Sequence, residues 1–283
     1  MLEKNNFEIL APVGRYEDLQ EIVAAGADAV YVGLQGFSSR PKQVDFTMGE
    51  IREAAEYCSS VGVSVYVAIN ACVSEGQLSQ LKEQLNELNE TKVSSAIIAD
   101  YGILHYYASM PGHKPIHAST LLGVNNRATV RELRKEGVER IILSTNLTLS
   151  EINDIIRFSD PELDYEIVAD GGLCYNCNFQ CALPHIMDDT GFHVYCQEPY
   201  ELVTDTMILP ARKRIGHSLI HLGPVMGLFM AIGVQSYKIE GRTNSKEHII
   251  RSVRNMKECR DRFLEAPISL DSYAHYVCRE WRH

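Results

Sequence analysis

The amino-acid sequence predicts an α/β fold, a (β/α)8 TIM-type barrel with a cysteine-rich insertion after strand seven. Eight short apolar runs alternate with helical patterns along most of the chain. Four glycines, Gly26, Gly62, Gly137 and Gly233, stand where helices would end in a left-handed residue. An open doubly wound sheet is the alternative, but the segment APVGRYED does not match the GxGxxG phosphate loop typical of that fold.

The eight apolar runs are rich in Val, Ile and Tyr and are short, as buried parallel strands are. In chain order the predicted strands are EILAPV at 8–13, AVYVGL at 29–34, VSVYVAIN at 63–70, AIIAD at 96–100, PIHAS at 115–119, RIILST at 140–145, YEIVAD at 165–170 and SYKIE at 236–240.

Amphipathic segments separate most of these strands, with apolar residues at intervals of three and four. Examples are YEDLQEIVAAG at 16–26, MGEIREAAEYCSSVG at 48–62 and EGQLSQLKEQLNELNE at 75–90. Another helix is expected to start near Ala211. The predicted organisation is one barrel domain over residues 1–265, including the insertion at 171–210, followed by a C-terminal tail at 266–283.

Composition and charge exclude several classes of protein. The chain has 283 residues, of which 45% are hydrophobic and 23% charged, as in ordinary globular domains. It contains no apolar run of the roughly 18 residues that a membrane span needs. The start MLEKNNFEIL lacks the features of a signal peptide, so we expect a cytoplasmic protein without membrane attachment. A net charge of −10 disfavours general nucleic-acid binding, although it does not exclude a local basic patch.

Polar residues gather where the predicted strands end, which in a barrel is where chemistry is found. They are Gln35, Asn70, Asp100, His117, Ser119, Thr120, Ser144, Thr145, Asp170, Glu240 and Arg242. Strand ends are often polar simply because they meet water. A ring of such residues at one mouth favours a binding or catalytic site.

The insertion carries Cys174, Cys177, Cys181 and Cys196 with the spacing C-x2-C-x3-C-x14-C. Four thiolates can hold zinc or an iron–sulfur cluster, and the spacing favours a metal centre over free thiols or a regulated disulfide. Structural zinc sites usually pair two CxxC knuckles, and this segment has one. The other cysteines, Cys58, Cys72, Cys259 and Cys278, are expected to be small buried hydrophobes, with Cys72 as a reserve ligand near the mouth.

Four stretches together resemble the collagenase-like peptidase family U32. They are EILAPVGRYEDLQEIVAAGADAVYVGLQGFSSR at 8–40, IHASTLLGVNN at 116–126, YEIVADGGLC at 165–174 and SYKIEGRTNSKEHIIRSVRNMKE at 236–258. The resemblance covers nearly the whole chain to about residue 265.

The resemblance implies two competing functions. The family name implies a metal-dependent or thiol peptidase. Other members are oxygen-independent hydroxylation proteins that modify RNA or a quinone precursor, carry a 4Fe-4S cluster and use prephenate as hydroxyl donor. Short members pair with a related subunit, so a third hypothesis is a non-catalytic, cluster-bearing partner of a paralogous chain.

Matched position by position, the family's cysteines correspond to Cys174, Cys181 and Cys196, and the resemblance implies that these three bind the cluster. The segment VTDTMILPARKR, where a fourth ligand often lies, has no cysteine, so Cys177 is the choice for that ligand. Asp170 stands where the family usually has His, which removes a neutral imidazole from that position.

Hydroxylation of a small molecule or an RNA base suits the residues better than proteolysis does, because the sequence has no GxSxG or HExxH motif. The predicted catalytic residues are His117, Glu240 and Asp170, and the predicted substrate-binding residues are Arg242, Arg40, Asn70 and Ser119. Arg242 would bind a substrate carboxylate through two parallel hydrogen bonds from its guanidinium. Glu240 would orient Arg242 or move a proton. The structural alternatives are a Glu240–Arg242 ion pair and a core histidine at position 117.

Overall fold

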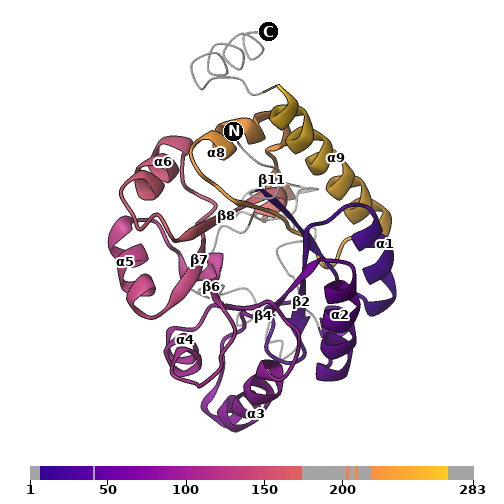
Figure 1. The fold of residues 1–283 in the computed structure, drawn as a ribbon, viewed down its shortest axis with the longest axis vertical. Coiled ribbons are helices and arrows are strands. Elements are labelled where there is room, and N and C mark those ends of the chain that lie inside the picture. Colours follow the sequence, from indigo (N-terminus) through magenta and orange to yellow (C-terminus); the bar gives the residue numbers. More distant parts are fainter. Residues whose placement is uncertain (1–6, 41, 174–201, 204–207, 210–217, 267–283) are drawn as a thin grey trace.

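Eight parallel strands close into a barrel, which confirms the predicted fold (Figure 1). The structure is a computed structural model that describes residues 7–40, 42–173, 202–203, 208–209 and 218–266. Around the barrel the strands are β1 (Glu8–Pro12), β2 (Ala29–Leu34), β4 (Ser64–Ile69), β5 (Ser95–Ile98), β6 (Ile116–Ala118), β7 (Val138–Ile142), β8 (Asp164–Leu173) and β12 (Ser236–Ile239). β12 pairs with β1, and β1 with β2, so the sheet has no open edge between them.

Helices surround the barrel and follow most of the strands (Figure 1). They are α1 (Leu19–Ala24), α2 (Met48–Ser60), α3 (Leu78–Asn89), α4 (Tyr101–Ala108), α5 (Arg127–Lys135), α6 (Leu149–Arg157), α8 (Met226–Ala231) and α9 (Lys246–Glu265). Capping boxes start α2 and α6, where Thr47 and Thr148 exchange hydrogen bonds with the residue three positions on. Each glycine predicted to follow a helix has a positive φ, which a side-chain-bearing residue rarely adopts.

The second half of the chain departs from the simple repeat. Strand β8 runs past the barrel rim, and β11 (Ser218–His221) pairs with its end in antiparallel register. The sequence predicts a helix that starts near Ala211. For residues 218–221 this prediction is wrong, because their backbone groups hydrogen-bond to β8 as the strand β11. Three short strands were also not predicted: β3 (Asp45–Phe46) beside β2, and the pair β9 (Leu202–Val203) and β10 (Ile208–Leu209).

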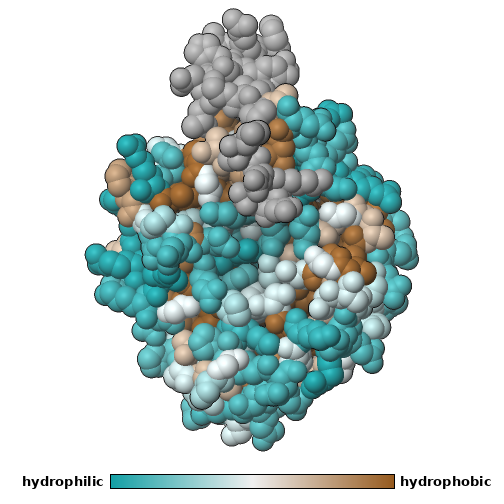
Figure 2. Space-filling model, in the orientation of Figure 1, coloured by the Kyte–Doolittle hydropathy of each residue, from teal (hydrophilic) through white to brown (hydrophobic). Residues whose placement is uncertain are grey.

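The main hydrophobic core lies between the strands and the surrounding helices, and a smaller apolar cluster fills part of the barrel. The inner cluster consists of Leu10, Ala29, Tyr31, Tyr66, Ala68, Ile97 and Ile142. The face in Figure 2 is mostly hydrophilic, as expected when the apolar residues pack inside. Within the described ranges, the structure contains no helix that is both long and apolar enough to span a membrane.

Candidate functional site

A cavity of about 100 Å³ opens at the carboxyl ends of the barrel strands. Seven residues of the predicted polar ring line it: Asn70, Ser119, Thr120, Ser144, Thr145, Glu240 and Arg242. Gln35 is exposed. Asp100 instead caps helix α4 through the backbone N–H of Ile103 at 3.0 Å. The mouth of the barrel therefore gathers most of the ring, and we call this space the mouth cavity.

Four polar side chains follow one another at every second position along β12 and the segment directly after it. Side chains two apart along a strand share a face. Ser236 lies at the start of β12, Lys238 lies at the floor of the mouth cavity, and Glu240 and Arg242 lie at its wall. The motif SYKIEGR thus lines the barrel from its amino end to its mouth.

Arg242 is held by residues from the loop and strand that follow β2. Its guanidinium donates to Ser38 Oγ at 2.7 Å and lies 3.2 Å from Asp45 Oδ1. Burial raises the pKa of Asp45, while the hydrogen bond from Ser38 and the charge of Arg242 oppose that rise. Gly33 makes room for this contact, because a Cβ there would lie 1.8 Å from Arg242 Nη1.

Glu240 holds Arg40, the second predicted anion contact. Its Oε1 lies 2.7 Å from Arg40 Nη2, and its Oε2 accepts the backbone N–H of Gly172 at 3.2 Å. Asn70 supports the same loop, because its Oδ1 accepts the N–H of Ser39 at 3.0 Å. The structure therefore assigns Asp45 to Arg242 and Glu240 to Arg40, a pairing that the sequence does not predict.

Lys238 forms the floor of the mouth cavity. Its Nζ lies 3.1 Å from Glu166 Oε1 and 4.1 Å from the ring centroid of Tyr31. Burial lowers the pKa of this amine, and the carboxylate of Glu166 partly opposes that effect. Tyr31 is itself fixed by donating its hydroxyl hydrogen to the backbone oxygen of Ile239.

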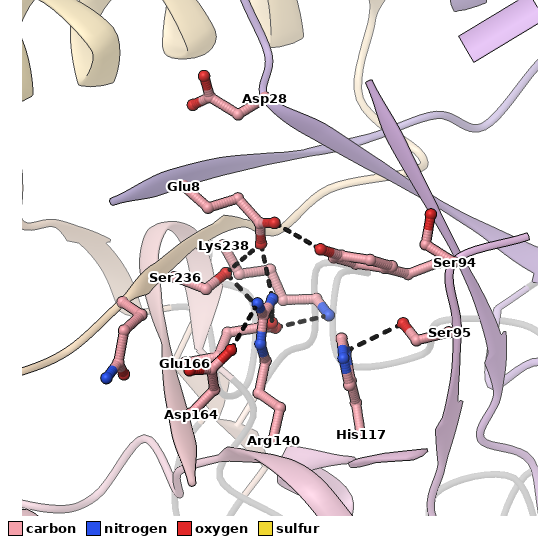
Figure 3. A network of polar contacts seen from close by, with 12 residues as sticks. Glu8, Asp28, Ser94, Ser95, His117, Arg140, Asp164, Glu166, Ser236 and Lys238 are labelled. Atoms are coloured by element: carbon pink, nitrogen blue, oxygen red, sulfur yellow. Dashed lines mark hydrogen bonds and ion pairs between the residues drawn. The ribbon is translucent and has the colours of Figure 1, made fainter. Parts of the chain in front are cut away.

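Beneath the cavity lies a cluster of hydrogen-bonded and charged side chains that we call the inner network (Figure 3). It consists of Glu8, Arg140, Asp164, Glu166 and Ser236. Arg140 lies 2.7 Å from Glu8 Oε1, 3.2 Å from Asp164 Oδ2 and 3.5 Å from Glu166 Oε2. Ser236 donates to both Glu8 and Glu166, and the hydroxyl of Tyr66 also donates to Glu8. Glu166 has no exposed surface, so these contacts replace its hydration.

His117 belongs to this lower layer and does not line the mouth cavity. Its Nδ1 lies 3.3 Å from Ser95 Oγ, and its ring packs edge-on against Tyr66 with centroids 4.7 Å apart. Burial, with smaller effects from Arg140 and Lys238, lowers its pKa well below the ordinary value. The imidazole is therefore neutral near pH 7 and is surrounded by barrel residues.

Two serines on the cavity wall differ in how they are satisfied. Ser119 Oγ accepts the backbone N–H of Leu121 at 3.3 Å and so starts the turn that follows β6. Ser144 is 5% exposed, and its Oγ has no hydrogen-bond partner among the described residues. A buried hydroxyl without a partner is costly unless something else bonds it.

Asp170 lies outside the mouth cavity, on the extension of β8. Its Oδ1 lies 3.1 Å from Nδ1 of His221, the residue opposite it on β11. Its backbone oxygen accepts the N–H of Glu240 at 2.7 Å, so Asp170 contributes to positioning Glu240.

The predictions for the cysteines have different outcomes. Cys174, Cys177, Cys181 and Cys196 lie outside the described residues, as does Cys278. Cys58 is buried as predicted, and burial raises the pKa of its thiol to about 11. The prediction of a buried Cys72 is wrong, because the residue is exposed in the loop after β4, and Cys259 is partly buried.

Sequence reasoning missed the charges inside the barrel, although a signal was present. Glu8 and Arg140 begin predicted apolar strands, Glu166 and Lys238 lie within two others, and such residues are rarely buried unless they are paired. Four charged residues in strands that become neighbours indicate a common interior network. No feature of the sequence indicates that Asp45 pairs with a buried arginine.

Comparisons with known proteins give a consistent assignment. The model of the family described as Peptidase family U32 matches residues 14–277. The tRNA hydroxylation protein P of Helicobacter pylori is 26% identical over 290 residues, covering 95% of this chain and 68% of that protein. The collagenase of Porphyromonas gingivalis is 26% identical over 278 residues, covering 90% of this chain and 65% of that protein. The chain thus spans about two thirds of the length of these relatives.

A solved structure described as the U32 peptidase Mk0906 shares the fold. It aligns with a TM-score of 0.57 at 11% identity, covering 85% of this chain and 95% of that one. At this identity the likeness concerns the fold.

Proposed function

Since the chain belongs to peptidase family U32, we propose that it takes part in the oxygen-independent hydroxylation of an RNA base or a small molecule. In this proposal the hydroxyl oxygen comes from a donor other than O2, with prephenate as the expected donor. The relative named a tRNA hydroxylation protein supports the reaction class. The mouth cavity, with its guanidinium groups and hydroxyls, supports a small anionic ligand.

One observation carries the proposal. Gly172 lines the mouth cavity, and Cys174 follows it by two residues. The described end of β8 thus reaches the mouth cavity, and in the sequence the cysteine-rich segment follows it directly.

The donor set fits an iron–sulfur cluster better than other groups. Within the described ranges, no group of three or more His, Cys, Asp or Glu residues could hold a metal ion. The four cysteines at 174, 177, 181 and 196 offer the thiolates that a 4Fe-4S cluster takes, with structural zinc as the alternative. When bound, the cluster would supply one-electron chemistry.

The cavity residues would bind and orient the ligand. Arg242 is fixed by Asp45 and Ser38 and presents a planar guanidinium suited to a carboxylate. Arg40 would be a second anion contact, and Glu240 would hold Arg40 or move a proton at the cavity wall. His117, which lies beneath the floor, would act through the residues above it.

The peptidase alternative has less support from the geometry. Serine proteolysis needs a nucleophile within hydrogen-bond reach of a base. Ser95 Oγ lies within hydrogen-bond reach of His117 Nδ1, but both side chains are buried and neither lines the mouth cavity, whereas Ser119, which does line it, accepts a backbone N–H. A relative named collagenase keeps proteolysis as an outcome of the test.

Anaerobic purification and nucleoside analysis test the proposal. We expect iron and sulfide near four per chain. We also expect hydroxylated nucleosides, detected by mass spectrometry, to disappear from RNA when the gene is deleted from its host. Cys174→Ser and Cys181→Ser should abolish both signals, whereas Cys259→Ser, a matched change on α9, should retain them.

Other outcomes separate the alternatives. Stoichiometric zinc without sulfide would contradict the cluster. Gelatin digestion that survives Cys174→Ser would favour a peptidase. An intact cluster combined with activity only after a second barrel protein co-purifies would indicate the partner-subunit hypothesis.

A further inference from the structure

Lys238 places a primary amine at the closed end of the mouth cavity. The residue is 9% exposed and lines the cavity floor. Arg40 and Arg242, the other cations on the cavity wall, carry guanidinium groups, which stay protonated and are poor nucleophiles. Burial readily lowers the pKa of a lysine, so that part of it is a neutral amine. A neutral amine can attack a carbonyl carbon.

The groups around Lys238 come from four other strands and from the end of its own strand. They are Glu166 on β8, Arg140 on β7, His117 on β6, Tyr31 on β2 and Arg242 after β12. The two arginines and burial favour the neutral amine, and Glu166 favours the ammonium form. Glu166 is also the group that can accept a proton from the amine, because its Oε1 lies 3.1 Å from Nζ.

The unpaired hydroxyl of Ser144 points independently to a ligand. Its Oγ is buried, lines the same cavity and has no hydrogen-bond partner among the described residues. Other buried groups also lack a partner, among them Ser159 Oγ and the Tyr165 hydroxyl, but of these three Ser144 is the one that lines the mouth cavity. A ligand oxygen in the cavity would give the Ser144 hydroxyl the hydrogen-bond partner that it lacks.

We propose that Lys238 is a carbonyl-reactive amine and that the mouth cavity takes a small 2-oxo acid. Lys238 Nζ lies 4.1 Å from the Tyr31 ring centroid, and Arg242 Cζ lies 5.9 Å from the same centroid. Both residues also line the mouth cavity, so the proposed ligand would place its ketone at the amine and its carboxylate toward the guanidinium. The inference rests on the proposed function in that it names the chemical class of the donor.

The covalent step balances without an oxidant. The ammonium of Lys238 gives a proton to Glu166, and the amine lone pair attacks the carbonyl carbon while the C=O π electrons move to oxygen. A proton passes from nitrogen to that oxygen, giving a carbinolamine. Glu166 returns its proton to the hydroxyl, which leaves as water, and the product is an iminium joined to Nζ.

Reductive trapping tests this inference on the purified full chain. The protein is incubated with pyruvate and cyanoborohydride at pH 7 and mapped by mass spectrometry after chymotryptic digestion. We expect a carboxyethyl adduct that is more abundant on Lys238 than on exposed Lys92, because burial lowers the pKa of the Lys238 amine and leaves more of it unprotonated at pH 7. Lactate, which has no ketone, should give no adduct, and acetone, which has no carboxylate, should label Lys238 weakly.

Two variants at position 238 separate reactivity from folding. Lys238→Arg keeps a cation beside Glu166 and should lose the adduct, and Lys238→Met should also lose it, whereas Lys92→Met should leave it unchanged. Peptide mapping of the unmodified sequence gives the same answer if the variants fail to fold. Adducts on surface lysines with Lys238 unmodified would overturn the inference, and equal labelling by acetone would overturn recognition of the acid.

The trapping result is independent of the cluster and of RNA. A failure to trap pyruvate, together with an intact cluster and hydroxylated RNA, would remove this inference and leave the proposed function. Specific trapping at Lys238 in a protein without iron and without hydroxylated product would remove the proposed function and leave the reactive amine.

Discussion

The inner network and the mouth cavity use similar side chains in opposite ways. In the inner network, Glu8 and Glu166 each meet several donors, and Arg140 contacts three carboxylates. At the mouth, Arg40 pairs with Glu240 and Arg242 pairs with Asp45, both arginines line the cavity, and Ser144 Oγ has no partner among the described residues.

In the proposed function, this difference separates charges that hold the fold from charges that would bind a ligand. A buried charge needs ionic or hydrogen-bond partners that replace its water. The carboxylates of Glu8 and Glu166 have such partners within the protein, whereas Arg140 Nε has no hydrogen-bond partner among the described residues. A group at a cavity can keep part of its hydrogen-bonding capacity for a ligand. Lys238 lies at the boundary, because it pairs with Glu166 below and faces the cavity above.

The largest expected effect follows from breaking the inner network at Arg140. Arg140→Met keeps much of the side-chain volume but leaves Glu166, which is fully buried, without one of its cations. Removing one partner of a buried ion pair typically costs about 3–5 kcal/mol. We expect a loss of that size in the free energy of unfolding, measured by urea denaturation.

A surface arginine on α5 provides the matched control. Arg131 pairs with Glu132 in a setting where its side chain is 71% exposed. Arg131→Met should change the free energy of unfolding by less than about 1 kcal/mol. Similar losses in both variants would mean that the inner network does not hold the barrel, and the comparison would fail.

A smaller effect is expected from the protonation of His117. Its pKa is lowered well below 6.5 in the folded protein, mainly by burial, so the folded ring is neutral where the unfolded ring takes up a proton. Stability is therefore retained above about pH 6.5 and lost below it, by about 1.4 kcal/mol per pH unit until the folded pKa is reached.

Denaturation of the parent protein and His117→Asn at pH 7.5, 6.5 and 5.5 checks the sign. The parent should lose more stability than His117→Asn between pH 6.5 and 5.5, and His105→Asn, a change at an exposed histidine, should behave like the parent. An equal pH response in the parent and His117→Asn would contradict a buried neutral imidazole.

The fold was predictable from sequence because strand and helix periodicities are local properties. All eight strand segments and the glycines that follow helices appear as predicted. The mouth was predictable in part, since strand ends such as Asn70 and Ser144 converge once the barrel closes. The ion pairs were not, because Arg40 finds Glu240 and Arg242 finds Asp45 across about 200 residues of chain. Nothing in a local pattern chooses between these partners.

The smallest and most direct test compares a serine from each region. Ser236→Ala removes donors to Glu8 and Glu166, so we expect a loss of about 1–3 kcal/mol in the free energy of unfolding. Ser144→Ala removes a buried hydroxyl that lacks a partner among the described residues, so stability should be unchanged or slightly higher. Pyruvate trapping should show the reverse order, falling about 3–10-fold in Ser144→Ala, as expected for one lost hydrogen bond, and little in Ser236→Ala. If Ser144→Ala destabilised the protein as much as Ser236→Ala and left trapping unchanged, Ser144 would contribute to the fold and not to the ligand site, because a hydroxyl that only a ligand bonds should affect trapping and not the free energy of unfolding.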